Sequence, residues 1–175
     1  LPPFKPRRTE AQIAKECPWA TTGRIGMRKP NIITSLELRS EEMEQNNLRI
    51  QAKYRVIEEK EVRYEEYKTE DAEYLIVAFG SAARIAKKVI AIAREQGIKV
   101  GLLRPITLWP FPSKVIAKLG KKVKGILSLE INAGQMVEDI RLAVECNVPV
   151  KWYGRLGGLI PEPEEVLDEI KKMTL

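Results

Sequence analysis

From residue 74 onward, hydrophobic residues alternate between short unbroken runs and helical spacing. Residues 74–79 are all apolar, which predicts a central strand that is covered on both faces. Residues 84–96 place apolar side chains at intervals of three and four positions, which predicts a helix with Gly97 as its C′ residue. The pattern therefore indicates a strand followed directly by a helix.

The same unit recurs to the end of the chain, so a sheet of several strands is expected. Short connections between alternating strands and helices predict a parallel sheet with helices on both faces. Ser113 is the expected N-cap of the second helix. The further strands are expected at 98–103, 125–130 and 148–152, and the further helices at 114–120, 133–145 and 163–172.

The chain before residue 74 follows a different pattern. Residues 62–67 mix apolar and charged side chains, as edge strands do. Residues 40–60 contain no Gly or Pro and few apolar residues, which predicts a charged helix that crosses between domains, with Ser40 as its N-cap. We expect three parts: an extended arm or linker over 1–40, a helix over 41–61 and an α/β domain over 62–175.

The first 40 residues are rich in Pro, Arg, Thr and Gly and have little periodicity. Such composition is typical of a disordered linker. The segment also contains Phe4, Trp19 and several Ile residues, which linkers seldom expose to water, so we favour an arm that lies along another domain or subunit. The chain begins without an initiator Met or a hydrophobic signal segment, and we therefore expect a piece of a longer protein.

Composition argues against self-contained catalytic chemistry. The chain has no His, which removes His-based triads, imidazole bases and most zinc sites. Cys17 and Cys146 are too few for an iron–sulfur cluster, which takes four ligands. Two separated cysteines indicate a reducing cytoplasm, and no apolar run is long enough to cross a membrane. We expect a cytoplasmic domain that has no catalytic residue and binds no metal or cofactor itself.

The net charge of +6 comes from 30 basic and 24 acidic residues that are mixed along the sequence. There is no basic block and no nucleic-acid-binding motif, so we expect a solvated, ion-paired surface and no nucleic-acid partner. A composition rich in Lys and Glu is also one that thermophile proteins favour.

The loops that follow the strands hold the candidate contact residues, because ligands of parallel sheets bind beyond the carboxyl ends of the strands. Gly80, Ser81 and Ala82 form a strand-to-helix turn whose N–H groups are able to bind an anion, although a tight turn alone also requires small residues. The loop after residue 103 interleaves prolines with Trp109 and Phe111. It suits either a contact surface or a rigid loop packed on its own domain.

Further candidate contacts come from the remaining strand ends. Arg104 would meet an anion or a partner carboxylate at the end of its strand. A second strand-to-helix turn, like the one at Gly80, contains Asn132, Gly134 and Gln135. Arg155 lies in a Gly-rich loop.

Glu130 ends a strand directly before that helix start. A carboxylate there is able to act as a general acid or base. No neighbouring residue completes a catalytic pair, so we expect a structural or interfacial role.

Four segments occur in a characteristic order: DAEYLIVAFGSAAR at 71–84, GIKVGLLRPITLWPFP at 97–112, EINAGQMVEDIR at 130–141 and YGRLGGLIP at 153–161. Together they resemble the α subunits of 2-oxoacid:ferredoxin oxidoreductases. The segment PWATTG at 18–23 is similar to the piece that follows the pyrimidine-binding domain in the branched-chain, 2-oxoisovalerate-type members. The resemblance covers nearly the whole chain.

The resemblance implies the fold of the transketolase C-terminal domain. That fold is a three-layer α/β/α arrangement, and its five-stranded, mostly parallel sheet has an antiparallel first edge strand. The resemblance also implies a parent complex that converts a 2-oxoacid and CoA to acyl-CoA and CO₂ while it reduces ferredoxin. Such a complex would use thiamine diphosphate, Mg, iron–sulfur clusters and CoA.

This chain would be a non-catalytic assembly domain of that complex, because the thiamine and cluster ligands are expected elsewhere. Its partners would be the thiamine-binding and iron–sulfur subunits, ferredoxin through the complex, and possible second copies of the chain. Its strand-end loops would make the subunit contacts. The sequence does not identify the 2-oxoacid.

Two other interpretations stay open. The first is the C-terminal domain of a transketolase or of the thiamine-dependent component of a 2-oxoacid dehydrogenase, against which the Trp-Pro-Phe-Pro run and the arm argue. The second is a flavodoxin-like module that holds a phosphate at the helix start of Ser81 or Gly134. The absence of a GxGxxG motif and of a Walker lysine weakens it.

Overall fold

The computed structural model describes residues 3–20, 29, 31–32 and 34–175. The chain divides into two compact units, Leu1–Asn47 and Leu48–Leu175. Residues 21–23 of the PWATTG segment, and the parts of the predicted arm at 1–2, 24–28, 30 and 33, lie outside the described residues. The predicted three-part division at residues 40 and 61 stays a prediction.

The first unit contains a short helix, α1 (Glu10–Glu16), that the weak periodicity did not predict. A capping box starts it: the N–H of Gln12 donates to Thr9 Oγ1 at 3.2 Å, and the N–H of Thr9 donates to Gln12 Oε1 at 2.8 Å. The signal was present in the sequence as Thr-x-x-Gln. None of the α1 residues is buried, and Phe4 and Trp19 are exposed.

Helix α2 (Ser40–Lys60) is long, highly charged and without a buried residue. It begins at Ser40, so the prediction that Ser40 stands before the helix as its N-cap is wrong. Glu41 and Glu42 lie in its first turn, where carboxylates interact favourably with the positive end of the helix dipole.

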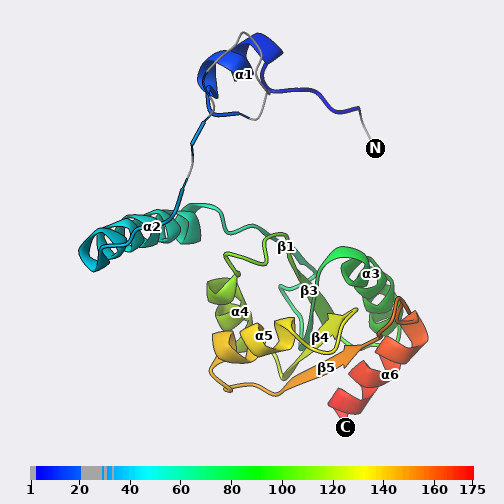
Figure 1. Cartoon of the computed structure of the whole chain (residues 1–175). Coiled ribbons are helices and arrows are strands. Elements are labelled where there is room, and N and C mark those ends of the chain that lie inside the picture. The colour runs from blue at the N-terminus through cyan, green and yellow to red at the C-terminus, as the bar shows by residue number, and fades with distance from the viewer. Residues whose placement is uncertain (1–2, 21–28, 30, 33) are drawn as a thin grey trace. The chain divides into compact units, whose positions relative to one another are not determined.

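The second unit contains a five-stranded sheet in the order β1-β3-β2-β4-β5 (Figure 1). The pairs β2–β3, β2–β4 and β4–β5 are parallel, whereas β1 pairs with β3 antiparallel, with Tyr64 opposite Pro105. The predicted fold, with its antiparallel first edge strand, is confirmed. The strands are β1 (Tyr64–Tyr67), β2 (Tyr74–Ala78), β3 (Val100–Pro105), β4 (Gly125–Glu130) and β5 (Val150–Gly154).

Two hydrophobic clusters hold the helices on opposite faces of the sheet (Figure 1). Helices α3 (Gly80–Glu95) and α6 (Pro163–Thr174) cover one face, and α4 (Ser113–Gly120) and α5 (Met136–Val144) cover the other. The central strands β2 and β4 are buried along their whole length, as the unbroken apolar run of β2 predicted.

Several predicted boundaries differ from the structure. Helix α3 begins at Gly80 and not at 84, because the predicted turn is itself the first turn of the helix after the N-cap Phe79. Ser113 is the first helical residue of α4 and Pro112 is its N-cap, so the predicted Ser113 cap is wrong. Helix α5 begins at Met136, three residues later than predicted.

Candidate functional site

The strand-end loops meet at one edge of the sheet. The carboxyl ends of β2, β3, β4 and β5 lie together because these four strands are parallel. Strand β1 runs the other way, so its first residue, Tyr64, lies at this edge beside Pro105. This edge therefore carries the loops that contain the sequence-predicted contact residues.

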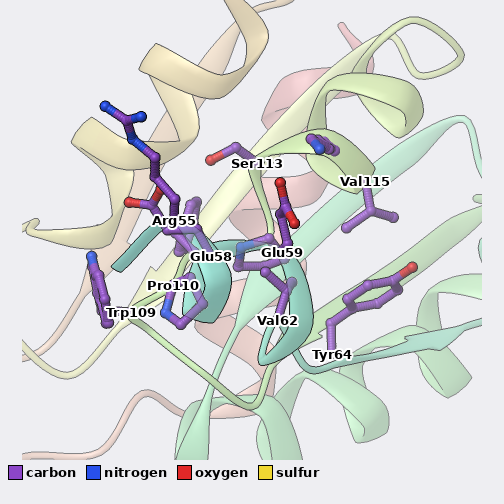
Figure 2. Close-up of a pocket in the computed structure, with 12 residues that line it drawn as sticks. Arg55, Glu58, Glu59, Val62, Tyr64, Trp109, Pro110, Ser113 and Val115 are labelled. Atoms are coloured by element: carbon purple, nitrogen blue, oxygen red, sulfur yellow. The ribbon is translucent and has the colours of Figure 1, made fainter. Parts of the chain in front are cut away.

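A groove of about 710 Å³ lies at the β3 side of this edge (Figure 2). Figure 2 shows side chains of α2 and of the loop after β3 lining it. The ring of Trp109 is 55% exposed and packs edge-to-face against Tyr54, with 5.3 Å between ring centroids. The lining residues are Arg55, Glu58, Glu59, Val62, Tyr64, Trp109, Pro110, Phe111, Pro112, Ser113, Lys114 and Val115.

The loop that presents Trp109 is held to the start of β1 by hydrogen bonds. The N–H of Arg63 donates to Thr107 Oγ1 at 3.0 Å, and the N–H of Ile106 donates to the Arg63 carbonyl at 2.9 Å. The Thr107 hydroxyl also donates to the Pro110 carbonyl at 2.9 Å. The loop is thus anchored on its own domain and still presents an aromatic side chain to solvent.

A smaller hollow, of about 260 Å³, lies between the start of α3 and the end of β3. Gly80, Ala83, Arg84 and Lys87 from α3 line it together with Arg104 from β3. The structure thus brings two of the predicted residues, Gly80 and Arg104, to one site. The sequence did not single out Arg84 and Lys87, because charged residues on a helix usually form a solvated face. They lie three residues apart near the start of α3 and therefore on the same side of the helix, which is the pattern that could have indicated the site.

Glu65 on β1 joins two of these cations. Its carboxylate pairs with Lys87 Nζ at 2.5 Å and with Arg104 Nη1 at 3.0 Å. The hydrogen bond from Lys87, followed by the one from Arg104, holds the pKa of the Glu65 carboxyl below its usual value. Arg84 pairs with no other side chain in the described part of the chain.

Glu130 is completely buried and serves as an internal cap for α5. Its Oε1 accepts from the Ser128 hydroxyl at 2.8 Å and from the N–H of Val137 at 3.0 Å. Its Oε2 accepts from the N–H groups of Gln135 at 3.0 Å and Met136 at 2.8 Å. These contacts satisfy the donors that a helix start leaves unpaired. The Glu130 side chain therefore has a structural role at the start of α5.

The predicted residues Asn132, Gly134 and Gln135 belong to the same turn. Asn132 Oδ1 accepts from the N–H of Gly134 at 2.7 Å and from that of Gln135 at 3.2 Å. With Glu130 also bound there, the helix start contains its own anion. A phosphate at the helix start of Gly134 would therefore have to replace these acceptors.

Arg155 connects the loop after β5 to α6. Its Nη1 pairs with Glu165 Oε1 at 3.1 Å, and Glu165 also accepts from the N–H of Glu162 at 3.0 Å. The Glu162 N–H, then a hydrogen bond from Tyr153, lowers the pKa of the Glu165 carboxyl. Burial, then the hydrogen bond to Glu165, raises the pKa of the Tyr153 phenol. Arg155 is thus engaged within its own domain.

Among the described residues, no group of three or more His, Cys, Asp and Glu side chains is arranged to hold a metal ion. Within the same ranges, no helix combines the length and apolar character that a membrane crossing requires.

Comparison with known proteins identifies the family. Residues 72–166 match the family model of pyruvate:ferredoxin oxidoreductase core domain II. The chain belongs to this family. The core domain II match includes the starts of α3 and α5 and the aromatic loop, which are also the segments on which the resemblance was based.

Two curated relatives extend the match. The chain is 45% identical to the ketoisovalerate oxidoreductase subunit VorB of Methanothermobacter marburgensis over 89% of its own length and 44% of that subunit. It is 32% identical to the 2-oxoglutarate synthase subunit KorA of Methanothermobacter thermautotrophicus over 61% of its length and 28% of that subunit. The chain therefore spans less than half the length of these relatives.

Solved structures agree on the fold. A 2-oxoglutarate:ferredoxin oxidoreductase from Magnetococcus marinus, with 2-oxoglutarate, coenzyme A and succinyl-CoA bound, matches with a TM-score of 0.71 at 22% identity, over 86% of this chain and 28% of that one. A split-gene transketolase, in an inactive β4 tetramer, matches with a TM-score of 0.56 at 17% identity, over 65% of this chain and 42% of that one. The likeness to transketolase is thus one of fold alone.

Proposed function

We propose that this chain is the C-terminal assembly domain of a thiamine-diphosphate-dependent ketoisovalerate:ferredoxin oxidoreductase. The parent complex would convert the 2-oxoacid and CoA to acyl-CoA and CO₂ and pass the electrons to ferredoxin. It would work in the cytoplasm. The observation that carries this proposal is the 45% identity to VorB over 89% of the chain. That share exceeds the second unit alone, so the likeness extends into the first unit.

The chemistry of the described residues supports a non-catalytic role. Their most deeply buried carboxylate, Glu130, already accepts hydrogen bonds from α5 and from Ser128. The absence of His from the chain removes the commonest general base. Thiamine diphosphate, Mg, iron–sulfur clusters and CoA would therefore be bound by the rest of the parent complex.

Exposed apolar side chains support an assembly role. Trp109 is 55% exposed at the strand-end edge, and Ile106 and Leu108 in the same loop are similarly exposed. Aromatic residues are enriched in the cores of protein interfaces. We assign the contacts with the thiamine-binding and iron–sulfur subunits to this edge, and a homodimer contact would use the same kind of surface. Ferredoxin would be met through the complex.

A complementation experiment tests this proposal. The parent complex is prepared without residues equivalent to this chain, and the 175-residue chain is then supplied separately. We expect the incomplete complex to have little ketoisovalerate-dependent ferredoxin reduction, and the added chain to join the complex in gel filtration and restore activity. The chain alone should be inactive.

A pair of variants identifies the contact surface. Trp109→Ala should weaken association, because a partly exposed aromatic anchor at an interface contributes about 2 kcal/mol or more. Leu142→Ala, which removes an exposed apolar side chain near the end of α5, is the matched control and should assemble normally. A folded wild-type chain that neither joins the complex nor restores activity would overturn the proposal. If Trp109→Ala and Leu142→Ala weaken association equally, the subunit contact does not lie at the strand-end edge.

A further inference from the structure

The hollow between α3 and β3 concentrates positive charge. Arg84, Lys87 and Arg104 surround it, and the Glu65 carboxylate is the acidic side chain that pairs with two of them. These three cations and one carboxylate together carry a net charge of +2, and Arg84 is the cation among them that has no pairing with Glu65. Lys87 and Arg104 are each 40% exposed, so their charges are only partly screened by water.

The position of the hollow also favours a ligand. It lies beyond the carboxyl ends of β2 and β3, where ligands of open α/β sheets bind. Gly80 lines it with a φ of +57°, and a Cβ at that position would meet nothing within 4 Å. The glycine is therefore required by the backbone conformation and not by packing, and the space above it is open.

From these observations we propose that the hollow binds the phosphate group of a small molecule. A phosphate monoester carries nearly two negative charges at neutral pH, which matches the net charge of +2 on Arg84, Lys87, Arg104 and Glu65. Its oxygens would accept from the guanidinium groups of Arg84 and Arg104 and from the Lys87 ammonium at once. The volume of about 260 Å³ suits one phosphate or a diphosphate, because sites for larger ligands begin at roughly 300 Å³.

Glu65 acts as a competitor in this site. Its carboxylate already occupies one side of Lys87 and Arg104, and their hydrogen bonds keep it ionised. A phosphate would share these two cations with Glu65 and would have Arg84 to itself. Removal of the Glu65 charge should therefore strengthen phosphate binding. If Glu65 had a structural role alone, its removal would not increase the affinity for phosphate.

The test is a titration of the 175-residue chain with inorganic phosphate and with pyrophosphate at constant ionic strength, followed by calorimetry and ³¹P NMR. We expect saturable binding of one equivalent. Arg84→Ala should weaken it roughly tenfold, the loss of one charge-assisted hydrogen-bonding group. Glu65→Gln should tighten it. Lys88→Ala, next along α3 but outside the hollow, is the matched control and should change affinity by less than about twofold.

Arg84 pairs with no other described side chain, so its replacement should leave the fold intact, which far-UV circular dichroism checks. Binding that does not saturate would overturn the proposal. So would equal losses in Arg84→Ala and Lys88→Ala, which indicate a diffuse basic surface. If Arg84→Ala leaves phosphate binding unchanged and instead weakens association with the partner subunits, the hollow is a protein contact and the proposal is wrong. None of these titrations depends on the result of the complementation experiment.

Discussion

Replacement of Glu130 provides the sharpest test of how this domain is held together. The side chain is completely buried and accepts four hydrogen bonds, three from backbone N–H groups at the start of α5 and one from Ser128. Glu130→Ala would leave all four donors without this acceptor and would open a cavity. Glu130→Gln keeps the volume, but its amide nitrogen must face at least one backbone N–H.

The magnitude follows from these contacts. A hydrogen bond to a charged group contributes about 1.5–3 kcal/mol, and contributions within one network are not additive. Loss of several buried hydrogen bonds together with the cavity left by the side chain costs about 3–5 kcal/mol, which we expect for Glu130→Ala. For Glu130→Gln we expect about 2–3 kcal/mol. Either loss is a large fraction of the roughly 5–15 kcal/mol that stabilises a typical domain.

The assay is urea unfolding followed by far-UV circular dichroism, which gives the free energy of unfolding and the m-value. The loss for Glu130→Ala corresponds to a fall in Tm of roughly 6–20 °C. Glu138→Gln makes the same chemical change on the exposed first turn of the same helix and is the control. It should cost less than about 1 kcal/mol, the contribution of a surface carboxylate near a helix start.

The reasoning is refuted if Glu130→Gln unfolds within about 1 kcal/mol of the wild type while the control behaves as expected. Such a result would mean that water or another group satisfies the α5 donors equally well. A large loss in Ser128→Ala alone would also contradict it, because that variant removes one neutral donor and leaves the three backbone contacts in place.

Two other outcomes follow from the geometry. The lowered pKa of Glu65 means that its pairing with Lys87 and Arg104 stabilises the fold above the ordinary carboxyl pKa of 4.5 and is lost as the pH falls through the lowered pKa. The stability difference between wild type and Glu65→Gln should therefore shrink in acid urea titrations, and a constant difference would contradict this pairing. Gly101→Ala should lower the free energy of unfolding in urea by about 1–3 kcal/mol, because its Cβ would lie 2.7 Å from the Lys68 carbonyl oxygen. An unchanged stability would contradict this prediction and would mean that the backbone at Lys68 shifts without cost to make room.

Part of the candidate site was visible in the sequence because it depends on local chemistry. Gly80 and Arg104 stand at the ends of apolar runs, and strand ends in a parallel sheet meet at one edge. Trp109 was visible because prolines on both sides exclude regular structure. Arg84 and Lys87 were missed, because their role depends on Arg104, which comes from a strand further along the chain.

The sequence by itself determined the alternation of strands and helices and the buried central strands. Complete burial on both faces leaves an unbroken apolar run, as in β2, and that signal is carried by adjacent residues. Only the tertiary structure decided that Glu130 caps α5 and that Glu65 joins two cations from different elements. Glu65 and its two partners are distant in sequence, and the Glu130 contact depends on how the chain turns between β4 and α5. No local sequence pattern encodes these distances.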